Sequence, residues 1–92
     1  MLISFDPAKR DATLADRGLA IEDASEVFAG PTFSLEDTRY DYGETRIVTV
    51  GWLERRMVIV VWTQRDEARH IISMSKANDR EQEKYRQRFE QS

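Results

Sequence analysis

The sequence predicts an α+β domain with its helices on one face of a twisted sheet. An N-terminal strand and two helices pack on a mainly antiparallel, four-stranded meander, and a C-terminal helix follows. Two changes of pattern predict it. Apolar residues recur at helical spacing in the first third of the chain, and the period becomes two from Thr32 onward. Near the C-terminus, a highly charged segment has helical propensity but few apolar residues. With 92 residues, we expect a single domain over residues 1–92 and no room for two.

The first thirty residues are expected to form one strand and two helices. Residues 2–5 suit a short strand, and Asp6 followed by Pro7 is a typical helix start, with Asp6 as the N-cap and Pro7 in the first helical position. Gly18 suits the end of that helix, and a second short helix is predicted over residues 21–28. Because each helix is too short to be stable alone, we expect both to pack their apolar stripes on one face of the sheet.

The middle of the chain is expected to form the meander. Phe33 and Leu35 alternate with polar neighbours, and a polar connection then runs over residues 36–44. Three longer strand candidates follow, and the segments that separate them are short enough for hairpins. An antiparallel arrangement is therefore predicted. The three candidates are Thr45–Trp52, Met57–Thr63 and Arg69–Met74.

A C-terminal helix is predicted over residues 79–89. Asn78 and Glu81, three residues apart, resemble a capping box at its start. Tyr85 and Phe89 lie one turn apart on its only apolar strip. We expect this helix to dock weakly, or to dock through a partner.

Composition excludes several classes of site. The chain has no cysteine, which excludes disulfides and thiolate sites and suits the cytoplasm, and its single histidine argues against a metal centre or cofactor. No apolar run approaches the roughly 20 residues that cross a bilayer, and no secretory leader is expected. The net charge of −3 divides into −6 through Glu44 and +3 from Thr45 onward, so a local basic surface is expected in the second half.

Five short motifs follow one another along the chain and carry a resemblance to a known family. In order and spacing, they resemble the BrnT family of RelE-like endoribonucleases from about Phe5 to Tyr85. The motifs are Phe5–Lys9, Arg17–Leu19, Glu26–Phe28 followed by Gly30-Pro31, Asp41–Glu44 with Arg46, and Arg69–Lys76.

The resemblance implies a RelE-like fold and a toxin that arrests growth by cutting RNA, with or without the ribosome. It also implies neutralisation by BrnA, an antitoxin with a ribbon-helix-helix part, so that DNA would be contacted only through the antitoxin. The chain departs from many relatives, because Thr13, Asp16 and Arg17 stand where they have Asn, Lys and His, and Met74-Ser75 stands where they have Ala-Arg. An alternative function is therefore a non-catalytic binding module that keeps the toxin fold in an autoregulatory complex.

Metal-free cleavage of RNA needs a base for the 2′-hydroxyl proton, a cation for the charge on the phosphate and an acid for the leaving 5′-oxygen. RelE-like enzymes are similar in using arginine, lysine, glutamate and tyrosine. We expect Arg69 to clamp the phosphate, Lys76 to act as a second cation or acid, and Glu81 to be the candidate base. Arg46 is expected to join them from a neighbouring strand. The expected RNA-binding residues are Tyr42, Ser73 and Tyr85.

These assignments have structural alternatives. Strand alternation places Arg69 and Ser73 on one face, but Arg69 can instead pair with Glu67. Lys76 and Glu81 can equally form a solvated turn, since exposed ion pairs are common and contribute little. Tyr42, likewise, can simply pin its own loop.

Two further residues are expected to be structural. Alternation groups His70, the only histidine, with Ile72 and Met74, which favours a core or edge role over catalysis. Trp62 ends an apolar run that is typical of a buried strand.

Overall fold

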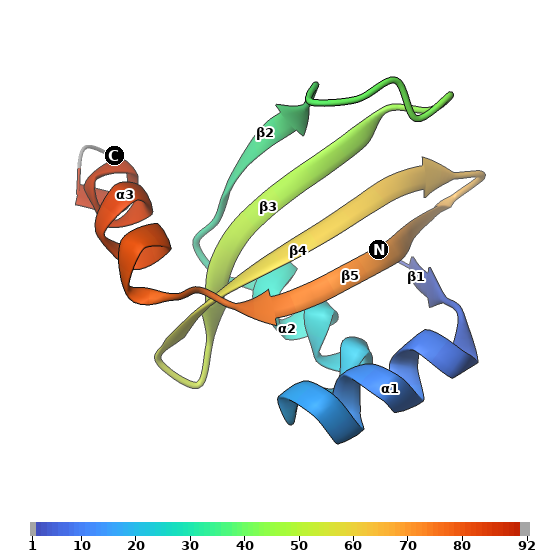
Figure 1. Ribbon diagram of the computed structural model, residues 1–92, viewed down its shortest axis with the longest axis horizontal. Helices are drawn as coiled ribbons and strands as arrows, with labels where there is room; N and C mark the ends of the chain where they lie inside the picture. Colours follow the sequence, from blue (N-terminus) through green and yellow to red (C-terminus); the bar gives the residue numbers. More distant parts are fainter. Residues whose placement is uncertain (1, 91–92) are drawn as a thin grey trace.

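The computed structural model describes residues 2–90 and contains a five-stranded sheet with helices on both sides (Figure 1). The strand order is β1-β5-β4-β3-β2. None of the helices in the described range is long and apolar enough to cross a membrane. In chain order the elements are β1 (Leu2–Phe5), α1 (Pro7–Arg17), the 3₁₀ helix η1 (Ile21–Asp23), α2 (Ala24–Ala29), β2 (Phe33–Asp37), β3 (Arg46–Leu53), β4 (Arg56–Arg65), β5 (Ala68–Lys76) and α3 (Asp79–Glu90).

The antiparallel meander is confirmed for β2 to β5, but the sheet is larger than predicted. β1 adds a fifth strand, which pairs in parallel with β5 from Leu2 opposite Ala68 to Phe5 opposite Ile71. The sheet is therefore mixed, not four-stranded. A four-residue strand carries no local signal for a partner more than sixty residues away, so its pairing depends on the tertiary fold.

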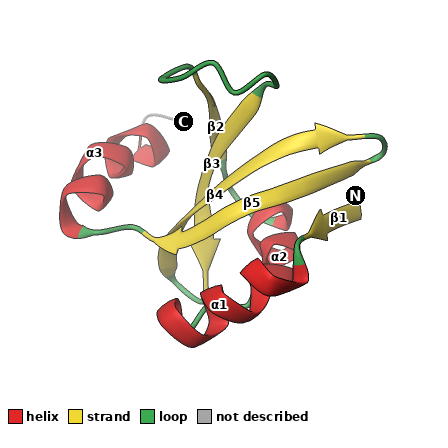
Figure 2. Ribbon diagram, turned by 45° about the vertical axis from the view of Figure 1, so that its right-hand side comes forward, coloured by secondary structure: helices red, strands yellow, loops and turns green. Residues whose placement is uncertain are grey.

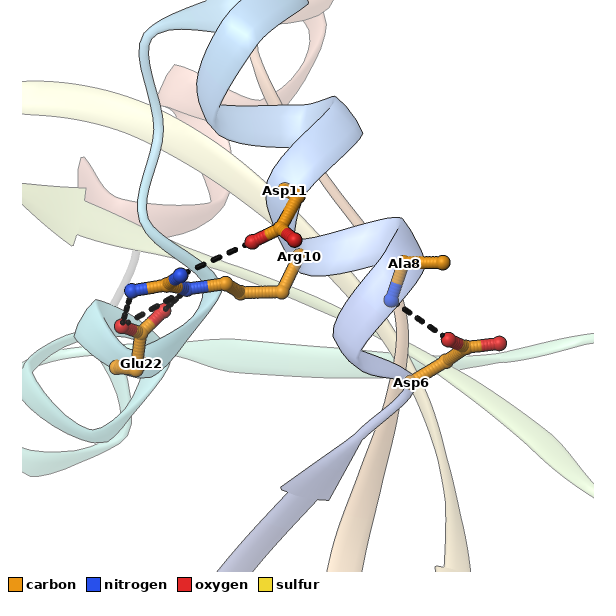
Figure 3. Close-up of polar contacts among 5 residues, drawn as sticks. All are labelled: Asp6, Ala8, Arg10, Asp11 and Glu22. Atoms are coloured by element: carbon orange, nitrogen blue, oxygen red, sulfur yellow. Dashed lines mark hydrogen bonds and ion pairs between the residues drawn. The ribbon is translucent and has the colours of Figure 1, made fainter.

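Helix α1 begins and ends as its sequence predicts. The Asp6 carboxylate accepts a hydrogen bond from the Ala8 amide at 2.8 Å, and Gly18 closes the helix in the left-handed region at φ 66° (Figure 3). Arg10 binds Glu22 at 2.8 Å, which ties α1 to η1 and lowers the pKa of the Glu22 carboxyl.

The predicted burial of the α1 apolar stripe is wrong. No residue of α1 is buried, and Leu14 remains 46% exposed. Polar groups hold the helix instead, because Arg17 donates to the Met74 carbonyl at 2.9 Å and Lys9 donates to the Ile72 carbonyl at 3.4 Å. These carbonyls lie on the part of β5 that extends beyond its pairing with β1, so α1 caps a free strand edge.

The main core lies between the sheet and the segment of η1 and α2. Val27 and Ile21 are fully buried there against apolar side chains of β4 and β5. Trp62 packs on this core, as expected, and its indole donates to Thr49 at 2.8 Å. The buried members of this cluster are Leu19, Ile21, Ala24, Val27, Val58, Val60, Ile71 and Met74.

Helix α3 packs on the opposite face of the sheet, whereas the sequence predicted helices on one face (Figure 2). Its capping box is confirmed, since Asn78 and Glu81 exchange hydrogen bonds of 2.8 and 3.0 Å. Tyr85 lies 5.5 Å from the Phe33 ring, and Phe89 lies 5.1 Å from Phe33 and 5.3 Å from Trp52. Aromatic contacts within the chain therefore dock this helix.

A β-bulge in β5 shifts the alternation of side chains between the two faces of the sheet by one residue. Val61 pairs with Ser73 but Trp62 pairs with Ile71, so Ile72 is one residue too many. Ile71 and Met74 consequently both face α2. His70 and Ser73 face the α3 side, and the predicted groupings of Arg69 with Ser73 and of His70 with Met74 are both wrong.

Candidate functional site

Polar side chains from all five strands meet in one row on the α3 face of the sheet, at the end away from α3. In the register of neighbouring strands, Asp37 lies opposite Arg46, Thr63 lies opposite His70, and His70 lies opposite Ser4. Ile47 opposite Trp62 sets Arg46 beside Thr63, which completes the row. We call Asp37, Arg46, Thr63, His70 and Ser4 the polar row.

Arg46 is fixed in the polar row by an aromatic ring and a carboxylate. Its guanidinium carbon lies 4.0 Å from the centroid of the Tyr42 ring, and its Nε lies 3.5 Å from Glu44. That Nε atom is buried and makes no hydrogen bond within the described residues, yet the side chain as a whole is 29% exposed. The guanidinium can therefore bind an anion at its exposed edge without first being ordered.

Glu44 connects two arginines. Its second oxygen lies 3.7 Å from Arg65, whose side chain is 53% exposed. With the neutral ion pair of Asp37 and Arg39 counted as well, three arginines and two carboxylates leave these five groups with a formal charge of +1. This excess charge favours an anionic ligand at the polar row.

Asp37 is a buried anchor for the loop that carries Tyr42. Its side chain is only 4% exposed, and it accepts hydrogen bonds from Arg39 at 3.0 Å and from the Tyr42 hydroxyl at 3.1 Å. The Arg39 guanidinium holds the pKa of this carboxyl well below its usual range. Tyr42 therefore does pin its loop, and it also supports Arg46.

His70 belongs to the polar row, and the structural role that the sequence predicts for it stays a prediction. Its Nδ1 lies 2.9 Å from the Ser4 hydroxyl oxygen. Burial, followed by the positive charge of Arg65, lowers the pKa of the imidazole, so it is neutral at neutral pH. The signal in the sequence was its being the only histidine, and the bulge concealed which face it occupies.

A groove of about 430 Å³ runs from the polar row to α3. Apolar residues of the sheet form its floor, and Tyr85 and Lys84 form the wall on α3. Ser75 opens into this groove, and Glu81 lines it while its carboxylate serves the capping box. Ser73 faces the same side as Val61, one row from His70.

Five of the seven predicted site residues thus share this face: Arg46, Tyr42, Ser73, Glu81 and Tyr85.

Arg69 and Lys76 lie on the opposite face. The Arg69 guanidinium stacks on Phe28 at 4.1 Å and on Trp62 at 4.9 Å, on the side of α2. Lys76 pairs with the core residue Val58 and lines a separate cavity of about 340 Å³ next to Gly18. The structure therefore does not bring either residue together with Arg46.

Within residues 2–90, no group of three or more histidine, aspartate or glutamate side chains is placed to hold a metal ion. A comparison with curated proteins finds no match. Residues 5–81, however, match the family model described as the ribonuclease toxin BrnT of type II toxin–antitoxin systems. This range includes Tyr42, Arg46 and His70 and most of the sheet. The chain therefore belongs to the BrnT family of ribonuclease toxins.

Proposed function

We propose that this chain is a metal-independent endoribonuclease whose reaction centre is the polar row. The observation that carries the proposal is the exposed edge of Arg46, held against Tyr42 beside a second arginine and a neutral histidine. A phosphodiester bound there would have a cation aimed at its non-bridging oxygens, where charge develops during 2′-hydroxyl attack. Cleavage of cellular RNA by this route would inhibit translation and arrest growth.

The groove beside the polar row supports binding of single-stranded RNA. The edge of Tyr85 and apolar side chains of the sheet offer a surface for a nucleobase, and Lys84 places a positive charge at the rim. Ser73, which lies between the groove and His70 on the same face of the sheet, would contact the RNA strand. Arg69 and Lys76 have no part in this arrangement, because they lie across the sheet.

The toxin assignment of the family supports an antitoxin partner. We infer a BrnA-like ribbon-helix-helix protein that silences the enzyme in the cytoplasm and alone contacts DNA. To block cleavage directly, such a partner would cover the polar row or the groove.

One observation favours the second candidate, a non-catalytic binding module. Ser75 opens into the groove at the position where the resemblance to BrnT toxins would place an arginine. The groove of this chain therefore has one cation fewer, which would weaken its hold on a phosphate.

The test compares Arg46→Ala with Arg86→Ala, an exposed arginine on the outer side of α3. Purified protein is incubated with RNA in the presence of a chelator, and product ends are mapped. We expect 2′,3′-cyclic phosphate ends, a rate about 10²- to 10³-fold lower for Arg46→Ala, and an unchanged rate for Arg86→Ala. Intact RNA with the folded wild-type protein would support the binding module instead.

A further inference from the structure

The contact between Ser4 and His70 joins two residues that lie 66 positions apart in the chain. Parallel pairing of β1 with β5 sets them directly opposite each other, and their polar atoms lie 2.9 Å apart. Within residues 2–90 this is the only hydrogen bond of the His70 side chain, and it uses Nδ1. The second ring nitrogen, Nε2, is therefore left available to a ligand on a partly exposed side chain.

We propose that His70 is the general base of RNA cleavage and that Ser4 is a positioning residue, which holds the imidazole with its proton on Nδ1. This inference rests on the proposed ribonuclease function. A histidine can take a proton at Nε2 only when Nδ1 carries the ring hydrogen. The Ser4 hydroxyl oxygen accepts that hydrogen, and it continues to do so once the ring is charged.

The reaction balances with the groups present. The 2′-hydroxyl proton passes to His70 Nε2 while the 2′-oxygen forms a bond to phosphorus. The bond from phosphorus to the 5′-oxygen breaks, and the leaving oxygen takes a proton from solvent water. The imidazolium then returns its proton to solvent. The products are a 2′,3′-cyclic phosphate and a 5′-hydroxyl, and no oxidant, reductant or further substrate takes part.

The position of His70 relative to Arg46 suits one phosphodiester. The two residues lie on β5 and β3, with β4 between them, so their backbones are about 10 Å apart at the usual strand spacing. Thr63 occupies the strand between them, and its side chain is shorter than those of Arg46 and His70. Both longer side chains can reach toward a ligand above it.

The charges around His70 favour a neutral ring. Arg65 on β4 and Lys9 on α1 lower its pKa, whereas Glu44 in the loop and Asp6 at the start of α1 raise it. Burial lowers the pKa more than any of these charges. A neutral imidazole at neutral pH is the form that a base requires.

The experiment uses Ser4→Ala, Ser4→Thr and His70→Gln in the full chain. Because His70 is the only histidine, ¹⁵N NMR reads its tautomer and its pKa without assignment of other rings. Ser34→Ala is the matched control, since it removes a similar strand hydroxyl that bonds Thr49 on the other face. Rates of oligonucleotide cleavage are measured from pH 5 to 9.

We expect the wild-type ring to carry its proton on Nδ1 and Ser4→Ala to shift the ring toward the Nε2 tautomer. Cleavage should fall about tenfold in Ser4→Ala, the scale of one hydrogen bond, with a changed pH profile and recovery in Ser4→Thr. His70→Gln should lose about 10²- to 10⁴-fold, and Ser34→Ala should keep the wild-type profile.

Two results would overturn the inference. If His70→Gln cuts as fast as the wild type while Arg46→Ala does not cut, then the site stands but His70 is not its base. If the wild-type ring is already the Nε2 tautomer and Ser4→Ala leaves it unchanged, then Ser4 does not position it. A folded wild-type protein that cuts no RNA would end both this inference and the proposed function.

Discussion

Arg46 and Arg69 show how the surroundings of one residue type decide what it can do. Both guanidinium groups stack on aromatic rings, and in both the Nε atom is buried without a hydrogen bond among the described residues. Arg46 adjoins Glu44 and a second arginine on the polar face. Arg69 instead lies over Phe28 and Trp62 at the rim of the core. The first is placed to bind an anion, and the second is placed to cover apolar surface.

Arg69→Ala should therefore reduce stability and leave catalysis intact. Loss of a cation–π contact with two rings should lower the free energy of unfolding by about 0.5–2 kcal/mol. Urea unfolding measures this change, and single-turnover cleavage measures the chemistry of the folded fraction. A folded Arg69→Ala protein with wild-type stability and no cleavage would restore Arg69 as the phosphate clamp that its sequence position suggested.

Gly51 is required where α2 approaches the sheet. A methyl group at this position would lie 2.6 Å from a Val27 side-chain carbon and 2.9 Å from one of Thr32. Val27 is fully buried, so the shift that this contact demands would disturb the packed core, and Gly51→Ala should destabilise the fold by about 1–3 kcal/mol. Gly30→Ala is the control, because the nearest atom to its new methyl group is 3.9 Å away. Equal melting temperatures for the two variants would contradict this account.

Among the elements, helix ends were predictable because their signals are local. Asp6, Gly18 and the pair Asn78 and Glu81 each act within a few residues, and each does what its sequence predicts. Pairing and bulges depend on partners far along the chain. The extra residue Ile72 in β5 is invisible in a two-residue alternation, yet it exchanges the faces of every side chain beyond it.

The residues of the candidate site follow the same rule: those fixed by local contacts were predictable, and those fixed by long-range pairing were not. Arg46 and Tyr42 lie only four positions apart in the sequence and are in contact in space, so they could be found from the chain alone. His70 could not be placed, because the bulge and the parallel partner strand together decide that it faces Ser4. The residues after the bulge were assigned to the wrong face for the same reason.

Two substitutions at the start of α3 distinguish a capping role of Glu81 from a catalytic role. Glutamine also completes a capping box, so Glu81→Gln should keep both the stability and the cleavage rate of the wild type. Asn78→Ala removes the other half of the box and should cost about 1 kcal/mol of stability. Thermal melting and initial rates test the pair. If Glu81 were the base, Glu81→Gln would melt normally but lose about 100-fold or more in rate.

At the scale of the whole molecule, one face of the sheet forms most of the core and the other face carries the candidate site. The face toward α2 holds the main core, and the face toward α3 holds the smaller aromatic cluster, the groove and the polar row. A chain this small can bury few residues, so each apolar side chain used for a binding surface is lost to the core. The polar row is compatible with stability only because its charged groups are paired or remain partly exposed.

The ionisable groups of this arrangement set how stability depends on pH. The pKa of His70 in the folded protein lies below its ordinary value of 6.5, so between those two values the unfolded chain binds more protons than the folded one. Stability therefore falls as the pH is lowered through and below about 6.5. Asp37 and Glu22 also have lowered pKa values, so their stabilisation is lost only as the pH falls below about 4, the ordinary range of carboxyl groups. Two separate acid steps are expected.

His70→Gln should remove the upper step and retain the lower one. Urea midpoints measured from pH 8 to pH 3 should fall below pH 6.5 in the wild type, whereas those of His70→Gln should stay level until about pH 4. Asp37→Asn should flatten the lower step instead and leave the upper one in place. A His70→Gln protein that still loses stability between pH 6.5 and pH 5 would show that a group other than the single histidine causes the upper step. The same curve bears on catalysis, because an imidazole that the fold keeps neutral is free to accept a proton throughout the physiological range.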